Sequence, residues 1–260
     1  QDADYLYENL QGALPAISLV NSVALGTAFA NDRAADLVFA QQVLGLGREG
    51  DVLFASVREG KTGSRAFLDD RAGLALAKLA LYDATLDRAF LDAAARHAGI
   101  AVREYFDPDH GGFFFSGTEN ETLPFRFKEA ADNALPSGNA IMSDVLTRLA
   151  VLAPDAVSAE VADKQFAYMK QQAALEPAAH TSFLLALSDR EQPPTRVVAV
   201  GAEDRTAIPL YVPLGTNVIL LNEQTVEYPL RNGRQTFYIC RGFACLPPTN
   251  DLNRERFRTC

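Results

Sequence analysis

Cysteine is scarce in this sequence, and its placement excludes a chain held together by disulfides. The 260 residues include three cysteines, Cys240, Cys245 and Cys260, all near the C-terminal end. Nothing upstream of them could be cross-linked. A disulfide framework that spans the whole fold is therefore ruled out.

Long apolar runs and a basic leader are also missing. The longest apolar stretches, such as residues 13–30, are interrupted by proline, serine and asparagine. A helix that spans a bilayer needs about 20 predominantly apolar residues, so we expect no membrane-crossing segment. The chain starts at Gln1 without methionine or a basic, apolar leader, which is typical of a processed product or a recombinant piece.

Positive charge is in short supply. Lys and Arg number 24 against 33 Asp and Glu, which gives a net charge of -9 and an isoelectric point of about 4.9. Because phosphate backbones and anionic lipids are bound through clustered basic residues, we expect neither nucleic acid nor a membrane surface as a partner. Hydrophobic residues make up 48% of the chain, enough to bury a large core, so a disordered chain is not expected.

Motifs for nucleotide phosphates, for zinc proteases and for serine hydrolases are absent. The sequence has no phosphate-binding P-loop, no HExxH and no GxSxG, and Gly45-Leu46-Gly47 is interpreted as the end of a helix. The three histidines, His97, His110 and His180, lie far in sequence from the cysteines, so a zinc site is not expected. The sequence therefore predicts no metal and no cofactor.

Hydrophobic residues recur at spacings of three and four along much of the chain, which predicts helices. Ser137 is suited to cap one of them, and Pro177 to begin another. A short connection makes the third and fourth an expected antiparallel hairpin. The predicted helices cover residues 14–28, 32–44, 67–82, 87–102, 137–152, 155–169 and 177–187.

The composition changes at residues 191–194, after which strands are expected. Asn232-Gly233 is a typical hairpin turn. The fold class predicted is mainly α, with a helical domain over residues 1–190 and a small α/β domain over 195–260. Strands are predicted at 197–200, 218–221 and 236–240, a loop with a short strand at 51–57, and a short strand or hydrophobic loop at 113–115.

Two groups of polar residues could carry chemistry. Asp69 and Asp70 stand at a helix start, where carboxylates either cap the helix or, in a cleft, act as an acid/base pair. Residues 128–139 concentrate charged and amide groups in a connection longer than a simple turn. This segment is either a turn followed by a helix cap or a functional loop.

The spacing of Cys240 and Cys245 suggests a third site. Four residues separate them, and a second pair of ligands for a structural zinc is lacking. A local disulfide or two buried thiols at a strand end fits this pattern. A functional dithiol is a further hypothesis, although redox pairs more usually have two intervening residues.

Four segments together resemble one family, the thioredoxin-domain-containing, spermatogenesis-associated (bacterial YyaL-like) proteins. They are residues 67–72, 111–114, 132–139 and 238–247, and they match in order and approximate separation. The resemblance implies an (α/α)6 toroid similar to six-hairpin glycosidases and sugar 2-epimerases, followed by a small α/β tail. Compared with the family, we expect the thioredoxin-like domain and, by the number of predicted helices, about half of the toroid to be lacking from this sequence. Arg71 occupies a position where an aromatic residue is usual.

The same resemblance implies a role for the polar residues. By fold-level analogy, Asp69, Asp70 and Asp132 would be catalytic groups at the sugar-binding end of the toroid. The residues expected to orient a substrate are Arg126, Lys128, Ser137 and Asn139.

Two functions follow as hypotheses. A half toroid leaves helix faces uncovered, which favours an interaction or assembly subunit that retains an acidic, sugar-binding-like cleft. Its partner would be a companion chain or another copy of itself. The alternative is a carbohydrate-active enzyme, a hydrolase or epimerase, with Asp70 and Asp132 as acid and base. The cytoplasm or an organelle lumen is the expected compartment.

Overall fold

The computed structural model describes residues 66–118, 126–202, 205, 207–242, 244–253 and 257. All of these described residues belong to one compact unit within residues 54–260. The helices predicted over 14–28 and 32–44, the strand predicted over 51–57 and Cys260 lie outside the described residues. The domain boundary at residues 191–194 stays a prediction.

The first two described helices form the predicted hairpin. Helix α4 spans Leu68–Thr85 and α5 spans Arg88–Tyr105. Leu86 between them has φ 53°, which reverses the chain, and the Asp87 carboxylate accepts a hydrogen bond of 2.9 Å from the Ala89 backbone N–H to start α5. The buried faces are rich in alanine, which lets the two helices approach closely.

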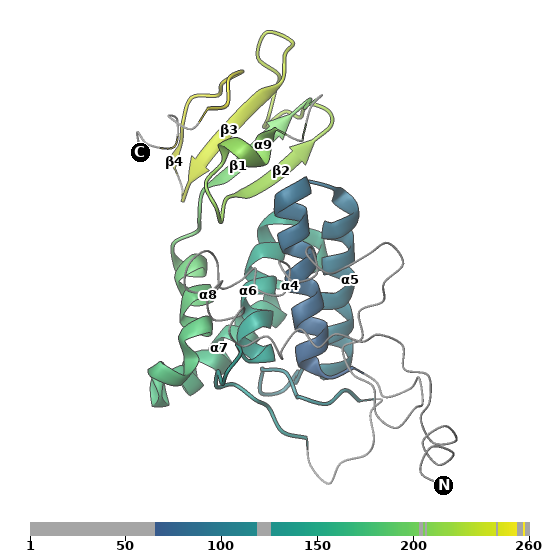
Figure 1. Ribbon diagram of the computed structural model, residues 1–260, viewed down its shortest axis with the longest axis vertical. Coiled ribbons are helices and arrows are strands. Elements are labelled where there is room, and N and C mark those ends of the chain that lie inside the picture. The colour runs from purple at the N-terminus through teal and green to yellow at the C-terminus, as the bar shows by residue number, and fades with distance from the viewer. Residues whose placement is uncertain are drawn as a thin grey trace, which may run out of the picture. The chain divides into compact units, whose positions relative to one another are not determined.

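Three further helices extend the array. They are α6 (Gly138–Leu152), α7 (Ala159–Leu175) and α8 (Thr181–Glu191). Two of them start later than predicted, because Pro154–Ala156 and Pro177–His180 form 3₁₀ turns ahead of α7 and α8. Helix α6 packs against both α4 and α8. Figure 1 shows α8, α6, α4 and α5 side by side across the view.

The tail is a small sheet. Its strands are β1 (Arg196–Val200), β2 (Asn217–Leu221), β3 (Thr236–Arg241) and β4 (Ala244–Cys245), in the order β2-β1-β3-β4. The pair β1–β2 is parallel, with the short α9 (Ile208–Tyr211) in the crossover, and the other pairs are antiparallel. Positive φ at Asn232 and Gly233 makes the predicted turn before β3.

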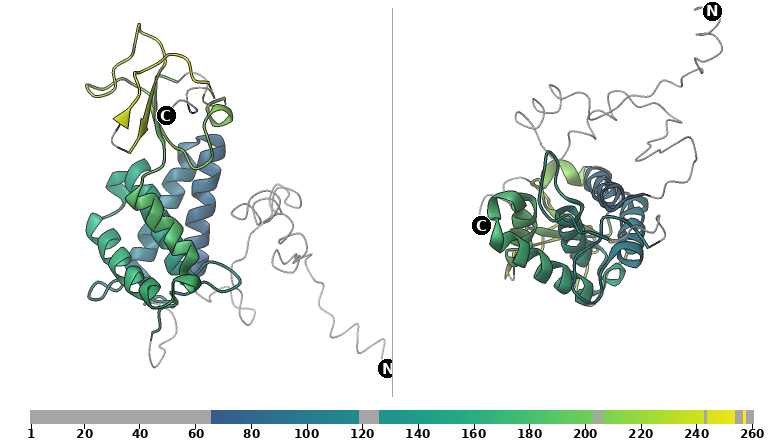
Figure 2. Two further views of the ribbon diagram at one scale, coloured as in Figure 1. Left: turned by 90° about the vertical axis from the view of Figure 1, so that its left-hand side faces the viewer. Right: turned by 90° about the horizontal axis from the view of Figure 1, so that it is seen from below.

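One hydrophobic core joins the helices to the sheet. It combines apolar residues of α4, α5 and α6 with buried residues of β1, β2 and β3. The Tyr82 hydroxyl, near the end of α4, donates a hydrogen bond of 2.8 Å to the backbone carbonyl of Val218 in β2. The sheet therefore meets the C-terminal end of α4, and in Figure 2 the view from below has the helices end-on with the strands behind them.

The fold predicted from the sequence is confirmed at the coarser level. The described residues are mainly helical with a small α/β tail. None of the described helices has the length and apolar character needed to span a membrane. A second, smaller apolar cluster lies among α6, α7 and α8 and includes Phe166, Met169 and Phe183.

Candidate functional site

The N-terminal ends of α4, α6 and α8 are linked by polar contacts away from the sheet. The Gly138 backbone N–H, at the start of α6, donates to Asp69 Oδ1 at 3.0 Å. Asp132 connects the start of α6 to the start of α8. We call this region the polar end; it comprises Asp69, Asp70, residues 126–139, Thr181 and Ser182.

Asp132 holds two helix starts together. Its Oδ1 accepts a hydrogen bond of 3.1 Å from the Ser137 backbone N–H, and its Oδ2 accepts one of 2.8 Å from that of Ser182. The Thr181 hydroxyl also donates to Oδ2, at 3.3 Å. Both carboxylate oxygens thus stabilise backbone groups that have no partner within their helices.

Asn139 is fully buried and supports the backbone of the polar end. Its Oδ1 accepts from the Phe113 N–H at 2.8 Å, and its Nδ2 donates to the carbonyls of Phe113 and Glu129 at 2.9 and 2.8 Å. Its exposed fraction is 0%. The side chain therefore lies out of reach of a ligand in solution and holds two loops in place.

Ser137 caps α6. Its hydroxyl accepts a hydrogen bond from the Ala140 N–H at 3.2 Å and donates one to the Ala130 carbonyl at 2.8 Å. The first residue of α6, Gly138, is glycine because any side chain there would collide with α4. A Cβ at this position would lie 2.4 Å from Asp69 Oδ1 and 2.9 Å from Leu68 Cγ. The Ser-Gly pair lets α6 start against α4.

Lys128 is bound to protein groups. Its ammonium donates to Asp107 Oδ2 at 2.8 Å and lies 4.9 Å from the centre of the Phe114 ring and 4.8 Å from that of Tyr168. Burial alone would raise the pKa of Asp107. The hydrogen bonds from Lys128 and from the His110 and Asp109 backbone N–H groups outweigh it, so this pKa is held well below its usual range.

Arg126 is likewise engaged. Its guanidinium donates to the backbone carbonyls of Ser116 and Glu104 and lies 4.2 Å from the centre of the Phe114 ring. Burial lowers the pKa of Arg126. Both basic residues predicted to orient a substrate thus fix the segments around Phe114 to the polar end.

Asp69 and Asp70 differ in their surroundings. Asp70 Oδ2 accepts a hydrogen bond of 2.8 Å from the Phe67 N–H, as a helix cap does, and burial raises its pKa. Asp69 is exposed as a residue, but its carboxylate lies against the start of α6. Burial, followed by the neighbouring charge of Glu129, raises the pKa of Asp69 despite the hydrogen bond from Gly138.

A shallow, open depression of about 390 Å³ lies beside these residues. Asp69, Asp70 and Asp132 do not line it. Phe127, one of its residues, is 42% exposed and ends a stack of rings: its centroid is 5.0 Å from that of Phe115, which is 4.7 Å from that of Phe67. The lining residues are Phe127, Lys128, Glu129, Ala130, Ala131, Gln172 and His180.

Four residues of this depression, residues 128–131, belong to the segment 128–139 that the sequence marked, whereas Phe127, Gln172 and His180 were missed. Gln172 and His180 belong to α7 and to the turn after it, far in sequence from residues 126–139. No local pattern marks them, because helix packing alone brings them there. Within the described part of the chain, no group of three or more His, Cys, Asp or Glu side chains is placed to hold a metal ion.

Comparisons with known proteins give partial similarities. Spermatogenesis-associated protein 20 from Rattus norvegicus is 37% identical over 84 residues, and that from Homo sapiens is 36% identical over 84 residues. In both cases the match covers 32% of this chain and 11% of the relative, so the chain spans about a ninth of these relatives' length.

A second similarity is to an enzyme. Phosphoheptose isomerase from Shewanella oneidensis is 41% identical over 58 residues, which cover 22% of this chain and 29% of the isomerase. No protein-family model matches the chain. The similarity to spermatogenesis-associated protein 20 is partial support for the family named from the four motifs, and the toroid is not established by it.

Proposed function

We propose that helices α4–α8 are an arc of an (α/α)6 toroid, and that the chain is an assembly module whose uncovered edge packs against a second copy. The alternation of the helices supports the arc: α4, α6 and α8 form one row, and α5 and α7 pack against it. In a complete toroid such a row of helices closes into a ring. Among the described residues of this chain, the row ends at α8.

The exposed leucines at α8 carry this proposal. Phe183 and Ala186 of α8 are buried, whereas Leu184 is 37% and Leu185 71% exposed. Leu175, the last residue of α7, is 82% exposed. Exposed leucines on the last helices of a row are typical of an interface, because apolar surface left in water costs free energy.

The charges beside these leucines favour a second copy as the partner. Lys170 pairs with Glu191 at 3.0 Å, and Arg190 pairs with Asp163, so both signs occur along the edge. A two-fold axis brings the same surface of two copies together. An edge that carries both signs can meet itself without a net repulsion.

The test is the association state of the full chain. We expect a concentration-dependent dimer in multi-angle light scattering and analytical ultracentrifugation. Leu185→Lys should shift it to monomer, because the charge would be buried at the interface. Leu214→Lys is the matched control, since Leu214 is 98% exposed in the tail and lies outside the edge. A wild-type chain that stays monomeric at all concentrations would overturn the proposal.

A second candidate function is sugar recognition at the polar end. Phe127 presents an exposed ring beside Lys128 and Glu129, and ligand sites commonly combine aromatic surface with a few polar groups. A stretch of 58 residues of the chain is similar to a protein named phosphoheptose isomerase, whose name gives the same ligand class. Asp70 and Asp132, the acid and base of the predicted hydrolase or epimerase, carry structural hydrogen bonds. For the polar end, we therefore propose sugar binding rather than sugar catalysis.

Sugar binding is tested by isothermal titration calorimetry of the chain with glucose and with maltose. If the depression is the site, we expect heat of binding that Phe127→Ala reduces by about tenfold in affinity, because one stacking surface is lost. Leu135→Ala is the control, since Leu135 is 51% exposed in the same segment but does not line the depression. No heat with either sugar, or an equal loss in both variants, would count against it.

A further inference from the structure

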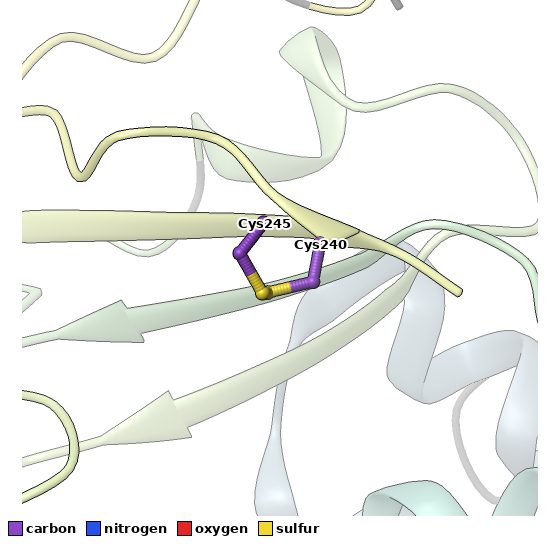
Figure 3. The surroundings of a disulfide bond; sticks show 2 residues. All are labelled: Cys240 and Cys245. Atoms are coloured by element: carbon purple, nitrogen blue, oxygen red, sulfur yellow. A yellow bond between two sulfur atoms is a disulfide. The ribbon is translucent and has the colours of Figure 1, made fainter. Parts of the chain in front are cut away.

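The tail contains a disulfide whose position is unusual for a purely structural cross-link. Cys240 in β3 and Cys245 in β4 are bonded, and they are directly paired residues of the two antiparallel strands (Figure 3). Their separation in sequence is 5 residues. A cross-link stabilises a fold more when it closes a longer loop, so this one restricts the unfolded chain very little.

Backbone pairing already holds this hairpin. Arg241 pairs with Ala244 beside the disulfide, and the Leu246 N–H donates to the Ile239 carbonyl at 2.9 Å. Further along, Phe237 and Thr249 exchange two backbone hydrogen bonds of 2.8 and 3.1 Å. The two strands therefore have reasons to stay together when the disulfide is open.

The two sulfurs differ in access. Cys240 is 3% exposed, whereas Cys245 is an exposed residue of the short edge strand β4. Thiol–disulfide exchange needs a thiolate to approach one sulfur along the line of the bond, so access decides which sulfur is attacked. From solvent, the attacked sulfur is that of Cys245, and the sulfur that leaves is that of Cys240.

The residue paired with the leaving cysteine across the sheet is basic. Arg196 in β1 is the residue directly paired with Cys240 on the side of β3 opposite to β4. Side chains of directly paired residues share a face of the sheet and lie about 4.5–5.5 Å apart at Cβ. Arg196, Cys240 and Cys245 thus form a row across three strands. From this position the long Arg196 side chain can bring its guanidinium to the Cys240 sulfur, and a neighbouring positive charge stabilises a thiolate and so makes it a better leaving group.

We propose that Cys240 and Cys245 are a redox-active pair that exchanges with an external dithiol, and that Arg196 promotes the exchange. One thiolate of the dithiol attacks Cys245 Sγ. The Cys240–Cys245 bond breaks, and Cys240 leaves with the bonding electrons and takes a proton from water. The second thiol of the dithiol then attacks its own bonded sulfur, which releases the Cys245 thiolate. Two electrons pass from the dithiol, which becomes a disulfide, to the protein.

The first experiment compares single thiols in the folded full chain. In a Cys260→Ser background, Cys240→Ser leaves Cys245 as the sole thiol, and Cys245→Ser leaves Cys240. We expect Cys245 to react with an aromatic disulfide reagent at least about tenfold faster than Cys240, because only Cys245 is exposed. Equal rates, or faster reaction at Cys240, would overturn the assigned order of attack.

The second experiment follows reduction of the intact disulfide in Cys260→Ser by dithiothreitol. We expect thiols to appear while the far-UV circular dichroism stays native, and faster than the chain unfolds. Arg196→Gln should lower the rate of disulfide reduction about threefold, because the departing Cys240 thiolate loses a stabilising positive charge. Arg196→Lys should leave this rate unchanged. Thiols that appear only at the unfolding rate would show that the cross-link is structural, and equal rates in the Gln and Lys variants would overturn the role of Arg196.

Discussion

Replacing Asn139 by alanine is expected to destabilise the described part of the chain by about 3–5 kcal/mol, the largest effect of any single change considered. The substitution removes a fully buried amide that forms hydrogen bonds with the Phe113 N–H and with the carbonyls of Phe113 and Glu129. A buried group left without its partner costs about 1–3 kcal/mol, and here three are left at once, although such costs do not simply add.

Urea unfolding followed by circular dichroism measures this loss. Asn133→Ala is the matched control: Asn133 is exposed, and its side chain donates to Glu129 Oε1 at 2.7 Å. We expect that change to stay within about 0.5 kcal/mol. Asn139→Asp should fall between the two variants in stability or fail to fold, because it keeps the acceptor but loses both donors. An unfolding midpoint unchanged by Asn139→Ala would refute the supporting role.

The second large effect is expected for Asp132→Ala, at about 2–4 kcal/mol. Asp132 accepts hydrogen bonds from the backbone N–H groups of Ser137 and Ser182, at the starts of two helices. The loss of one helix cap costs about 0.5–2 kcal/mol, and this carboxylate serves two. In thermal unfolding, each kcal/mol lowers Tm by about 2–4 °C for a domain of this size.

The control for Asp132 is Asp155→Ala, since Asp155 is an exposed residue in the turn before α7. Its Tm should stay within about 2 °C of the wild type. The same pair of variants separates positioning from catalysis. If Asp132 acted only on a substrate, its removal would leave Tm unchanged, and this outcome would restore it as an acid/base candidate.

The polar end is held together by Asp132 and Asn139, so these two residues have structural roles. Asp132 and Asn139 belong to the segment where a resemblance to sugar-active toroids implied catalytic and binding roles. Their contacts are with backbone groups of α6, α8 and the loop at Phe113. Asp69 is different, because burial and the neighbouring charge of Glu129 raise its pKa, and perturbed pKa values cluster at functional sites.

Features with a local physical cause were predictable from the sequence. The helix hairpin of α4 and α5 follows from hydrophobic spacing and from Asp87, whose carboxylate reaches the N–H of Ala89 two residues away. Ser137 as a cap and Asn232-Gly233 as a turn are equally local. The late starts of α7 and α8 were missed, because a proline favours a helix start without deciding between an α-helix and a 3₁₀ turn.

The amino-acid sequence by itself determined where most described helices and strands lie, that acid groups gather at helix starts, and that Cys240 and Cys245 stand close together. These follow from interactions between residues a few positions apart. Only the tertiary structure decided what these groups do, because their partners are distant in sequence: Asp132 meets Ser182, Asn139 meets Phe113, and Cys240 stands opposite Arg196. Packing chooses such partners, and no short sequence pattern encodes them.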